Sequence, residues 1–229
     1  EGGNGGAPAT QNIVTTDTSL QLIGTDFASN SATYAAWTWK ANGSGVSNTD
    51  GSISSTISVN QKIGFSIVSY TGTGSAGTIG HGLGAEPVMG IFKNRTSGST
   101  NWRVWHSGIA NNQILELNTT NAAGVPGTAD FDIASNTTSV WGLSTNTQAN
   151  GSGSDYIAYI FAPVESYSAF GKYVGNGSTD GPFIFTGHRP AWIMTKRTDS
   201  TGNWLIFDAE RGIYNLNDNY LYANSSNAE

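Results

Sequence analysis

The sequence predicts an all-β protein made of tandem antiparallel β-sandwich units of the jelly-roll kind, with little helix. Three observations support this prediction. Short runs of β-branched and aromatic residues alternate with clusters of Gly, Asn, Ser and Asp, which is the usual strand and turn signal. No apolar period of 3.6 residues lasts for three turns, so helices should be scarce. The chain also repeats itself, which is typical of tandem units.

The repeat is visible in two separate patterns. The pattern Tyr-x-Gly-x-Gly-Ser at residues 70–75 returns at residues 173–178, and the pair Asn-Trp at residues 101–102 returns at residues 203–204. Both return after about a hundred residues, and such a constant separation indicates two copies of one unit.

A third pattern marks the end of a unit. Tyr34–Ala41 is similar to Tyr156–Ala162, with a Tyr-x-Ala-aromatic-x-aromatic order in both. We therefore expect the chain to hold incomplete repeats on both sides of a complete one. The expected parts are a flexible lead-in at 1–11, the C-terminal part of a preceding repeat plus a linker at 12–61, a complete β-sandwich repeat at 62–166, and the N-terminal part of a second repeat at 167–229. We expect truncation of the second repeat; closure within one chain and completion between chains are the alternatives.

Each expected strand is a short run of apolar or aromatic residues bounded by turn residues. Asn-Gly dipeptides at residues 150–151 and 176–177 mark turns, because both residue types tolerate positive φ. The expected strands are residues 19–23, 34–39, 53–59, 64–70, 88–93, 102–106, 113–117, 131–133, 139–143, 156–161, 171–173, 183–186, 192–195, 204–208 and 220–222.

Composition excludes several function classes. Charged residues make up 11% of the 229 residues, and the net charge is −6, with no basic run to follow a nucleic-acid backbone. The chain has no cysteine, which excludes disulfides and thiolate metal sites. No apolar run reaches the roughly 20 residues of a membrane span, so we expect no membrane insertion. The neutral surface, rich in Ser, Thr, Asn and Gly, favours a virion or extracellular protein.

Carboxylates give little support to catalysis. A glycan hydrolase needs two carboxylates about 5–10 Å apart, and no pattern typical of sandwich glucanases surrounds those available. Asp130 and Asp132 would share one face of a strand, but a solvated face explains this equally well. We expect no enzyme activity and no catalytic residues. The carboxylates considered were Glu86, Glu116, Asp130, Asp132, Asp155 and Glu165.

Metal and cofactor sites are also not indicated. His81 and His188 both follow Gly and precede a Pro, which favours hydrogen bonds that stabilise turns over metal ligation. Residues 176–181 have oxygen ligands at alternate positions, but the bidentate Glu of a calcium loop is missing. A hairpin loop explains this segment better, and we expect no metal and no cofactor.

Aromatic side chains are the remaining candidates for binding. Trp102 and Trp204 occupy equivalent repeat positions at the start of a strand, which favours the sandwich core. Four others alternate with small or polar residues, so some of them should face outward, where Trp can stack on a sugar or anchor a protein interface. These glycan or interface candidates are Trp37, Trp39, Trp141 and Trp192.

Several longer stretches carry a family resemblance. Residues 36–51, 64–72, 80–84 with Pro87, and 170–182 resemble a repeat module of structural proteins from marine tailed bacteriophages. Those proteins are described as tail-fibre-like or lectin-like, and their module is associated with concanavalin-like β-sandwiches. The resemblance covers nearly everything from Ala36 to Glu229. It implies a virion or extracellular β protein, and it implies no catalytic residues.

The sequence thus leads to one main functional expectation and two alternatives. We expect a phage virion protein of the tail-fibre or appendage type, which binds host-surface glycans, assembles through its sheet edges, and associates with itself and with other virion proteins. The first alternative is a self-assembling extracellular filament subunit, whose half-repeats are completed between chains. The second is a glycan-degrading enzyme.

Overall fold

The computed structural model describes residues 12–15, 19–23, 30–211 and 219–227. The lead-in expected at residues 1–11 lies outside these ranges. The chain divides into two compact units, residues 1–40 and residues 41–229. In the first unit, β1 (Asn12–Thr15) and β2 (Leu20–Ile23) form an antiparallel pair.

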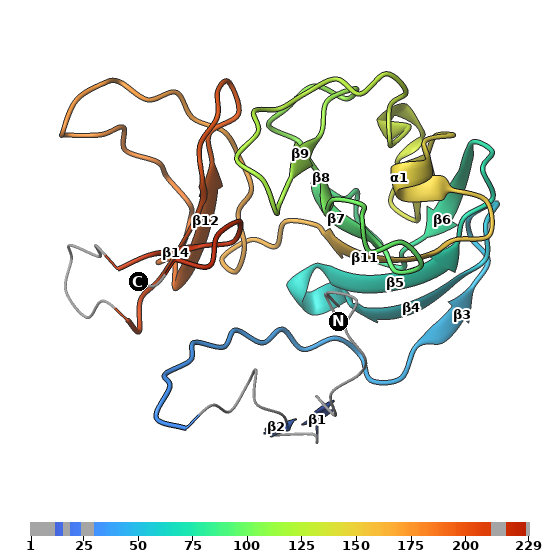
Figure 1. The fold of residues 1–229 in the computed structure, drawn as a ribbon, viewed down its shortest axis with the longest axis horizontal. Helices are drawn as coiled ribbons and strands as arrows, with labels where there is room; N and C mark the ends of the chain where they lie inside the picture. The colour runs from blue at the N-terminus through green and yellow to red at the C-terminus, as the bar shows by residue number, and fades with distance from the viewer. Residues whose placement is uncertain (1–11, 16–18, 24–29, 212–218, 228–229) are drawn as a thin grey trace. The chain divides into compact units, whose positions relative to one another are not determined.

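The second unit is built on a seven-stranded antiparallel sheet with the order β3-β4-β5-β11-β7-β8-β9 (Figure 1). All six pairings in this sheet are antiparallel. Its strands are β3 (Val46–Asn48), β4 (Ser55–Asn60), β5 (Phe65–Thr71), β7 (Met89–Asn94), β8 (Arg103–His106), β9 (Leu115–Glu116) and β11 (Asp155–Phe161).

Strand β11 is the central strand of this sheet, although it is the last of the seven in sequence order. Tyr156 lies opposite Tyr70 of β5 on one side and opposite Asn94 of β7 on the other. Buried residues alternate with half-buried or exposed ones along it, because successive side chains of a strand point to opposite faces of the sheet. Tyr156, Ala158 and Ile160 therefore face the core together.

A second layer covers this face of the sheet. Strands β6 (Gly77–Gly80) and β10 (Val140–Leu143) pair antiparallel, and a parallel bridge joins Ile53 to Ile79. The short helices are η1 (Gln61–Ile63), η2 (Ile133–Ser135) and α1 (Thr147–Asn150). The core between the layers contains Ile79, Phe92 and Tyr156. The prediction of an all-β fold with antiparallel sheets and little helix is confirmed.

A three-stranded antiparallel sheet follows in the same unit. It consists of β12 (Trp192–Lys196), β13 (Trp204–Asp208) and β14 (Leu221–Tyr222). Trp204 packs into a cluster with Met89, Val104 and Leu115, which lie on the side of the seven-stranded sheet away from the sandwich core. The Trp204 Nε1–H donates to the Glu116 backbone oxygen at 2.9 Å.

This sheet has the same pairing registers as β7-β8-β9. In β7-β8-β9, Met89 lies opposite His106, and Arg103 lies opposite Glu116. The equivalent pairs in β12-β13-β14 are Trp192 with Asp208 and Leu205 with Tyr222. The sequence repeat thus corresponds to a repeated three-strand arrangement.

Side-chain hydrogen bonds are repeated as well. Asn118 accepts from the Trp102 backbone N–H at 2.9 Å, and its own Nδ2 donates to Asn101 Oδ1 at 2.9 Å. Asn224 makes the same two bonds, with the Trp204 backbone N–H at 2.7 Å and with Asn203 Oδ1 at 2.8 Å.

The structure corrects some of the expected boundaries. The strand expected at residues 53–59 forms as β4, but it pairs with β5 and with β3. Both β3 and β4 therefore belong to the sheet of the unit expected to start at residue 62, and not to a preceding repeat or a linker. Strands β1, β3 and β6 are not among the predicted strands. No strand forms at four of the expected places, residues 34–39, 131–133, 171–173 and 183–186.

Candidate functional site

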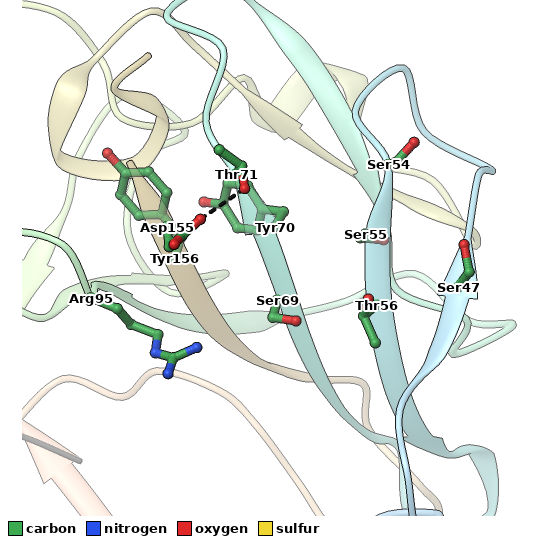
Figure 2. Close-up of a pocket in the computed structure, with 10 residues that line it drawn as sticks. All are labelled: Ser47, Ser54, Ser55, Thr56, Ser69, Tyr70, Thr71, Arg95, Asp155 and Tyr156. Atoms are coloured by element: carbon green, nitrogen blue, oxygen red, sulfur yellow. Dashed lines mark hydrogen bonds between the residues drawn. The ribbon is translucent and has the colours of Figure 1, made fainter. Parts of the chain in front are cut away.

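A polar hollow of about 400 Å³ lies on the seven-stranded sheet, and it is open to solvent (Figure 2). Most of its lining residues carry a hydroxyl group, and one basic and one acidic residue complete it. The lining residues are Ser47, Ser54, Ser55, Thr56, Ser69, Tyr70, Thr71, Arg95, Asp155 and Tyr156.

The register of the strands brings these hydroxyl groups together. Thr56 of β4 lies opposite Ser47 of β3 on one side and opposite Ser69 of β5 on the other. Side chains directly opposite each other share a face, so these three form a row across the sheet. Ser55 and Tyr70 point to the other face and are buried. The row therefore lies on the face away from the sandwich core.

Charged groups lie at one end of the hollow. Thr71 Oγ1 donates to Asp155 Oδ1 at 2.8 Å, as Figure 2 shows. The Arg95 backbone N–H donates to the Asp155 backbone oxygen at 2.7 Å, so both charged residues are held close together in the chain fold. Arg95 and Asp155 are both exposed. The hollow thus offers donors and acceptors together with one group of each charge.

A second charged cluster is buried in the sandwich. Arg103 of β8 forms ion pairs with Glu116 and with Asp130. Burial raises the pKa of the Asp130 carboxyl, which the adjacent Arg103 opposes. Burial also acts to raise the pKa of Glu116, but hydrogen bonds from Asn101 and Asn121 and the Arg103 charge lower it overall.

The other carboxylates considered from the sequence do not join this cluster. Asp132 is exposed whereas Asp130 is fully buried, so the two do not share one face as expected. The physical reason is that residues 131–133 form no strand; Phe131 makes a single bridge to Leu143 instead. No local motif indicates this cluster, because Glu116 and Asp130 lie 13 and 27 residues after Arg103.

The four candidate Trp residues lie in different environments. Trp39 is 40% exposed, and Trp37 and Trp192 are half-buried. Trp141 is wholly buried in the core, against Phe92, Phe131 and Trp105, so its proposed role in glycan or interface contacts is wrong.

The two Trp residues expected in the core differ. Trp204 is buried, as expected. Trp102 is half-buried and stacks on Tyr159, with ring centroids 6.5 Å apart, outside the sandwich core.

His81 stabilises a turn, as its sequence context predicts. Its Nδ1 accepts from the Leu83 backbone N–H at 3.1 Å, and its Nε2 lies 3.3 Å from the Thr137 oxygen. This pair of contacts requires the neutral ring with the proton on Nε2. Burial lowers the pKa of His81, against smaller opposing effects from its backbone contacts and from Asp50.

The neutral His81 predicts a loss of stability in mild acid. The folded state resists protonation, so its stabilising contribution is full above the unfolded pKa of about 6.5 and is lost as pH falls toward the lower folded pKa. We expect His81→Asn to flatten the dependence of the denaturation midpoint on pH between about 7 and 5.5. The flattening should be partial, because burial lowers the pKa of His106 too. Equal slopes for both proteins would contradict the prediction.

The other expected turn and loop sites form only in part. Nδ1 of His188 has no hydrogen-bond partner among the described residues, and residues 183–186 before it form no strand. Asn176 Nδ2 donates to the Asp180 oxygen at 2.9 Å, which closes a loop, but no strands flank it as in a hairpin. Within the described ranges, no group of three or more His, Cys, Asp or Glu residues is placed to hold a metal ion. None of the helices described is both long and apolar enough to cross a membrane.

Comparison with known proteins gives a family but no activity. No curated protein and no solved structure matches the chain. The model of a family described as a domain of unknown function, DUF7483, matches residues 9–229. Because this match covers nearly the whole sequence, the chain belongs to the DUF7483 family.

Proposed function

We propose that the protein is a structural component of a bacteriophage virion, of the tail-fibre or appendage type, that binds host-surface glycans in the polar hollow. The observation that carries the glycan-binding part is the row of hydroxyl groups across β3, β4 and β5, with Arg95 and Asp155 at one end. The virion part is supported by the sequence resemblance to phage structural proteins, and it implies a location on the phage particle.

The chemistry of the hollow suits a saccharide. Sugar hydroxyls donate and accept hydrogen bonds at once, and Ser and Thr hydroxyls can do both as well. Bonds in which one partner is charged are stronger, so Arg95 and Asp155 would contribute most of the affinity. The hollow is open and polar, which suits weak binding of a saccharide by one copy of the protein. Many copies along one appendage would bind together with an avidity above the affinity of a single copy.

Binding without catalysis is the favoured form of this function. The two carboxylates that the fold brings together, Glu116 and Asp130, are both bound by Arg103 in the interior. A glycosidase needs its acid and its base beside the glycosidic bond, and a guanidinium between the two carboxylates occupies that place.

Binding to a glycan array tests the proposal. We expect the intact chain to bind a subset of surface saccharides, and Arg95→Ala or Asp155→Asn to weaken that binding by about tenfold, the effect of one charged hydrogen bond. Arg197→Ala is the matched control, because Arg197 occupies the repeat position equivalent to Arg95 but pairs with Asp199 at the surface. Equal binding by all three variants would contradict the role of the hollow.

The virion role has its own test. Antibodies against this chain, viewed by electron microscopy on phage particles that encode it, should label an appendage. Labelling only of free material would contradict the virion part and leave the glycan part standing.

A further inference from the structure

Strand β12 is an edge strand, although its counterpart β7 is not. In the seven-stranded sheet, β7 lies between β8 and β11. β12 pairs with β13 in the register that β7 has with β8, but no strand in the described part of the chain lies on its other side. The Ala209 backbone N–H donates to the Ala191 backbone oxygen, so Ala191 belongs to a hydrogen-bonded pair with β13. Hydrogen-bonded and non-hydrogen-bonded pairs alternate along an antiparallel ladder. The backbone N–H and C=O groups of Met194 and Lys196 therefore point away from β13.

The segment before β12 is also without the partner that its counterpart has. Residues 170–174 correspond to the end of β5, which pairs with β11, but they form no strand. Tyr173 is 56% and Val174 is 87% exposed. Farther along, Phe183 and Phe185 are 90% and 84% exposed. Exposed apolar groups beside an open sheet edge are typical of a surface that pairs with another strand.

A strand with the pattern of β11 exists elsewhere in the chain. In β11, Tyr156, Ala158 and Ile160 face the core, while Tyr159 and Phe161 lie on the opposite face. In residues 34–39, Tyr34, Ala36 and Thr38 occupy the positions equivalent to the core-facing residues of β11. Trp37 and Trp39 occupy the positions equivalent to Tyr159 and Phe161. In the structure, residues 32–42 form no helix or strand.

We propose that Tyr34–Trp39 of one copy adds as a β-strand to the open edge of β12 in a second copy, in the place that β11 takes beside β7. The register follows from the repeat. Ala158 lies opposite Phe92 in the complete sheet, and the equivalent pair is Ala36 with Thr195. Trp37 then lies opposite Met194. Residues 170–174 would pair on the other side of the added strand, as β5 pairs with β11.

The length of the connection favours a second copy over the same chain. The Asn42 backbone N–H donates to Ser58 Oγ at 3.1 Å, and Ser58 Oγ donates to the Gly43 oxygen at 2.9 Å, so the chain is held to β4 directly after residue 41. From there, Trp39 can reach only about 10 Å. Met194 of β12 packs against a cluster that contains Trp204 and residues of β7, β8 and β9. The middle one of these three strands, β8, is about 19 Å from β4 across the sheet, before the distance between packed layers is added.

Such an exchange makes an open-ended assembly. Each copy would donate residues 34–39 and accept the same segment at β12, so the two contact surfaces differ. Contacts of this kind form filaments when the rotation between copies does not close a ring. This assembly requires no glycan, so its test is independent of the binding proposed for the hollow.

Disulfide cross-linking tests both the pairing and the partner. The chain has no cysteine, so introduced thiols are the only ones present. The Arg95 backbone N–H donates to the Asp155 backbone oxygen, so these two residues form a hydrogen-bonded pair. Counting along the ladder, Ala158 and Phe92 form a non-hydrogen-bonded pair, in which the side chains of opposite residues are closest. The equivalent variants are Ala36→Cys and Thr195→Cys, each in the full chain, mixed and oxidised. The matched control is Ala35→Cys with Thr195→Cys, because Ala35 is on the opposite face of the added strand.

We expect a covalent heterodimer from the mixture of Ala36→Cys and Thr195→Cys, and at least about tenfold less from the Ala35→Cys control. The double variant Ala36→Cys/Thr195→Cys should give a ladder of covalent oligomers on a non-reducing gel. A cross-linked monomer from the double variant, together with no heterodimer from the mixture, would overturn the exchange between copies in favour of closure within one chain. No cross-link above the control in either experiment would overturn the pairing itself.

Discussion

Replacement of Arg103 by Ala is expected to lower the free energy of unfolding by about 3–5 kcal/mol, which is the usual cost of removing one partner from a buried ion pair. Asp130 is fully buried, Glu116 is half-buried with 12% of its side chain exposed, and Arg103 is the cation that pairs with both. Without it, the fold must either bury two carboxylates or protonate them, and both options cost stability. Urea denaturation measures the change, provided that the slope of the transition stays constant.

Arg197→Ala is the control for this experiment. Arg197 also forms an ion pair, with Asp199, but both side chains are exposed, at 62% and 75%. Solvent screens such pairs, so the stability should change little. If Arg103→Ala were as mild as Arg197→Ala, the triad would not be a stabilising part of the sandwich.

Replacement of Trp141 by Ala is expected to cost a similar amount, about 3–5 kcal/mol. Among the described residues, Trp141 is the largest fully buried side chain, and its ring lies 5.2 Å from Phe92 and 5.5 Å from Phe131, measured between centroids. Its removal would leave a cavity between β10 and the seven-stranded sheet that rigid neighbouring rings cannot fill. Thermal and urea denaturation of the purified variant would measure the loss.

Trp102→Ala provides the matched comparison. Trp102 is half-buried and stacks on a single ring, that of Tyr159, so its removal loses fewer contacts. We expect its cost to be clearly smaller than that of Trp141→Ala. Equal costs would contradict the central place of Trp141 in the core.

The strands that the sequence predicts best are rich in aromatic and β-branched residues. β5 and β11 have such runs between turn residues, and both form where expected. β6 was missed because two of its four residues are Gly, which weakens any strand signal. At Gly80, a Cβ would lie 1.6 Å from Asn48 Oδ1, so a larger residue would displace the Asn48 side chain from its hydrogen bond with Asp50. That contact depends on the fold and has no local signature.

The expected strands at residues 34–39 and 171–173 fail for a different reason. Their patterns match those of β11 and β5, which are strands in the complete unit. A strand needs a neighbouring strand for its ladder of backbone hydrogen bonds, and among the described residues neither segment is part of a sheet. Local sequence predicts which residues are able to pair, whereas the presence of a partner is decided by the rest of the assembly.

The candidate site was only partly accessible to prediction. Ser and Thr are common along the whole chain, so the hydroxyls of Ser47, Thr56 and Ser69 carry no signal until strand register brings them into one row. Trp141 was misplaced because it alternates with small residues in the sequence. In the structure, three successive residues of β10 are buried, so alternation does not indicate an exposed face there.

The late position of β11 in the chain has a consequence for synthesis on the ribosome. β5 and β7 (Met89–Asn94) are synthesised well before β11, which begins only at Asp155. Thr71 of β5 and its hydrogen-bond partner Asp155 of β11 are 84 residues apart. At about 5–20 residues per second, the nascent chain spends several seconds with a gap one strand wide between β5 and β7. During that interval, a chaperone or a β11-like segment from a neighbouring nascent chain can compete for the gap. We therefore expect the yield of correctly folded protein to fall as ribosomes crowd on one message.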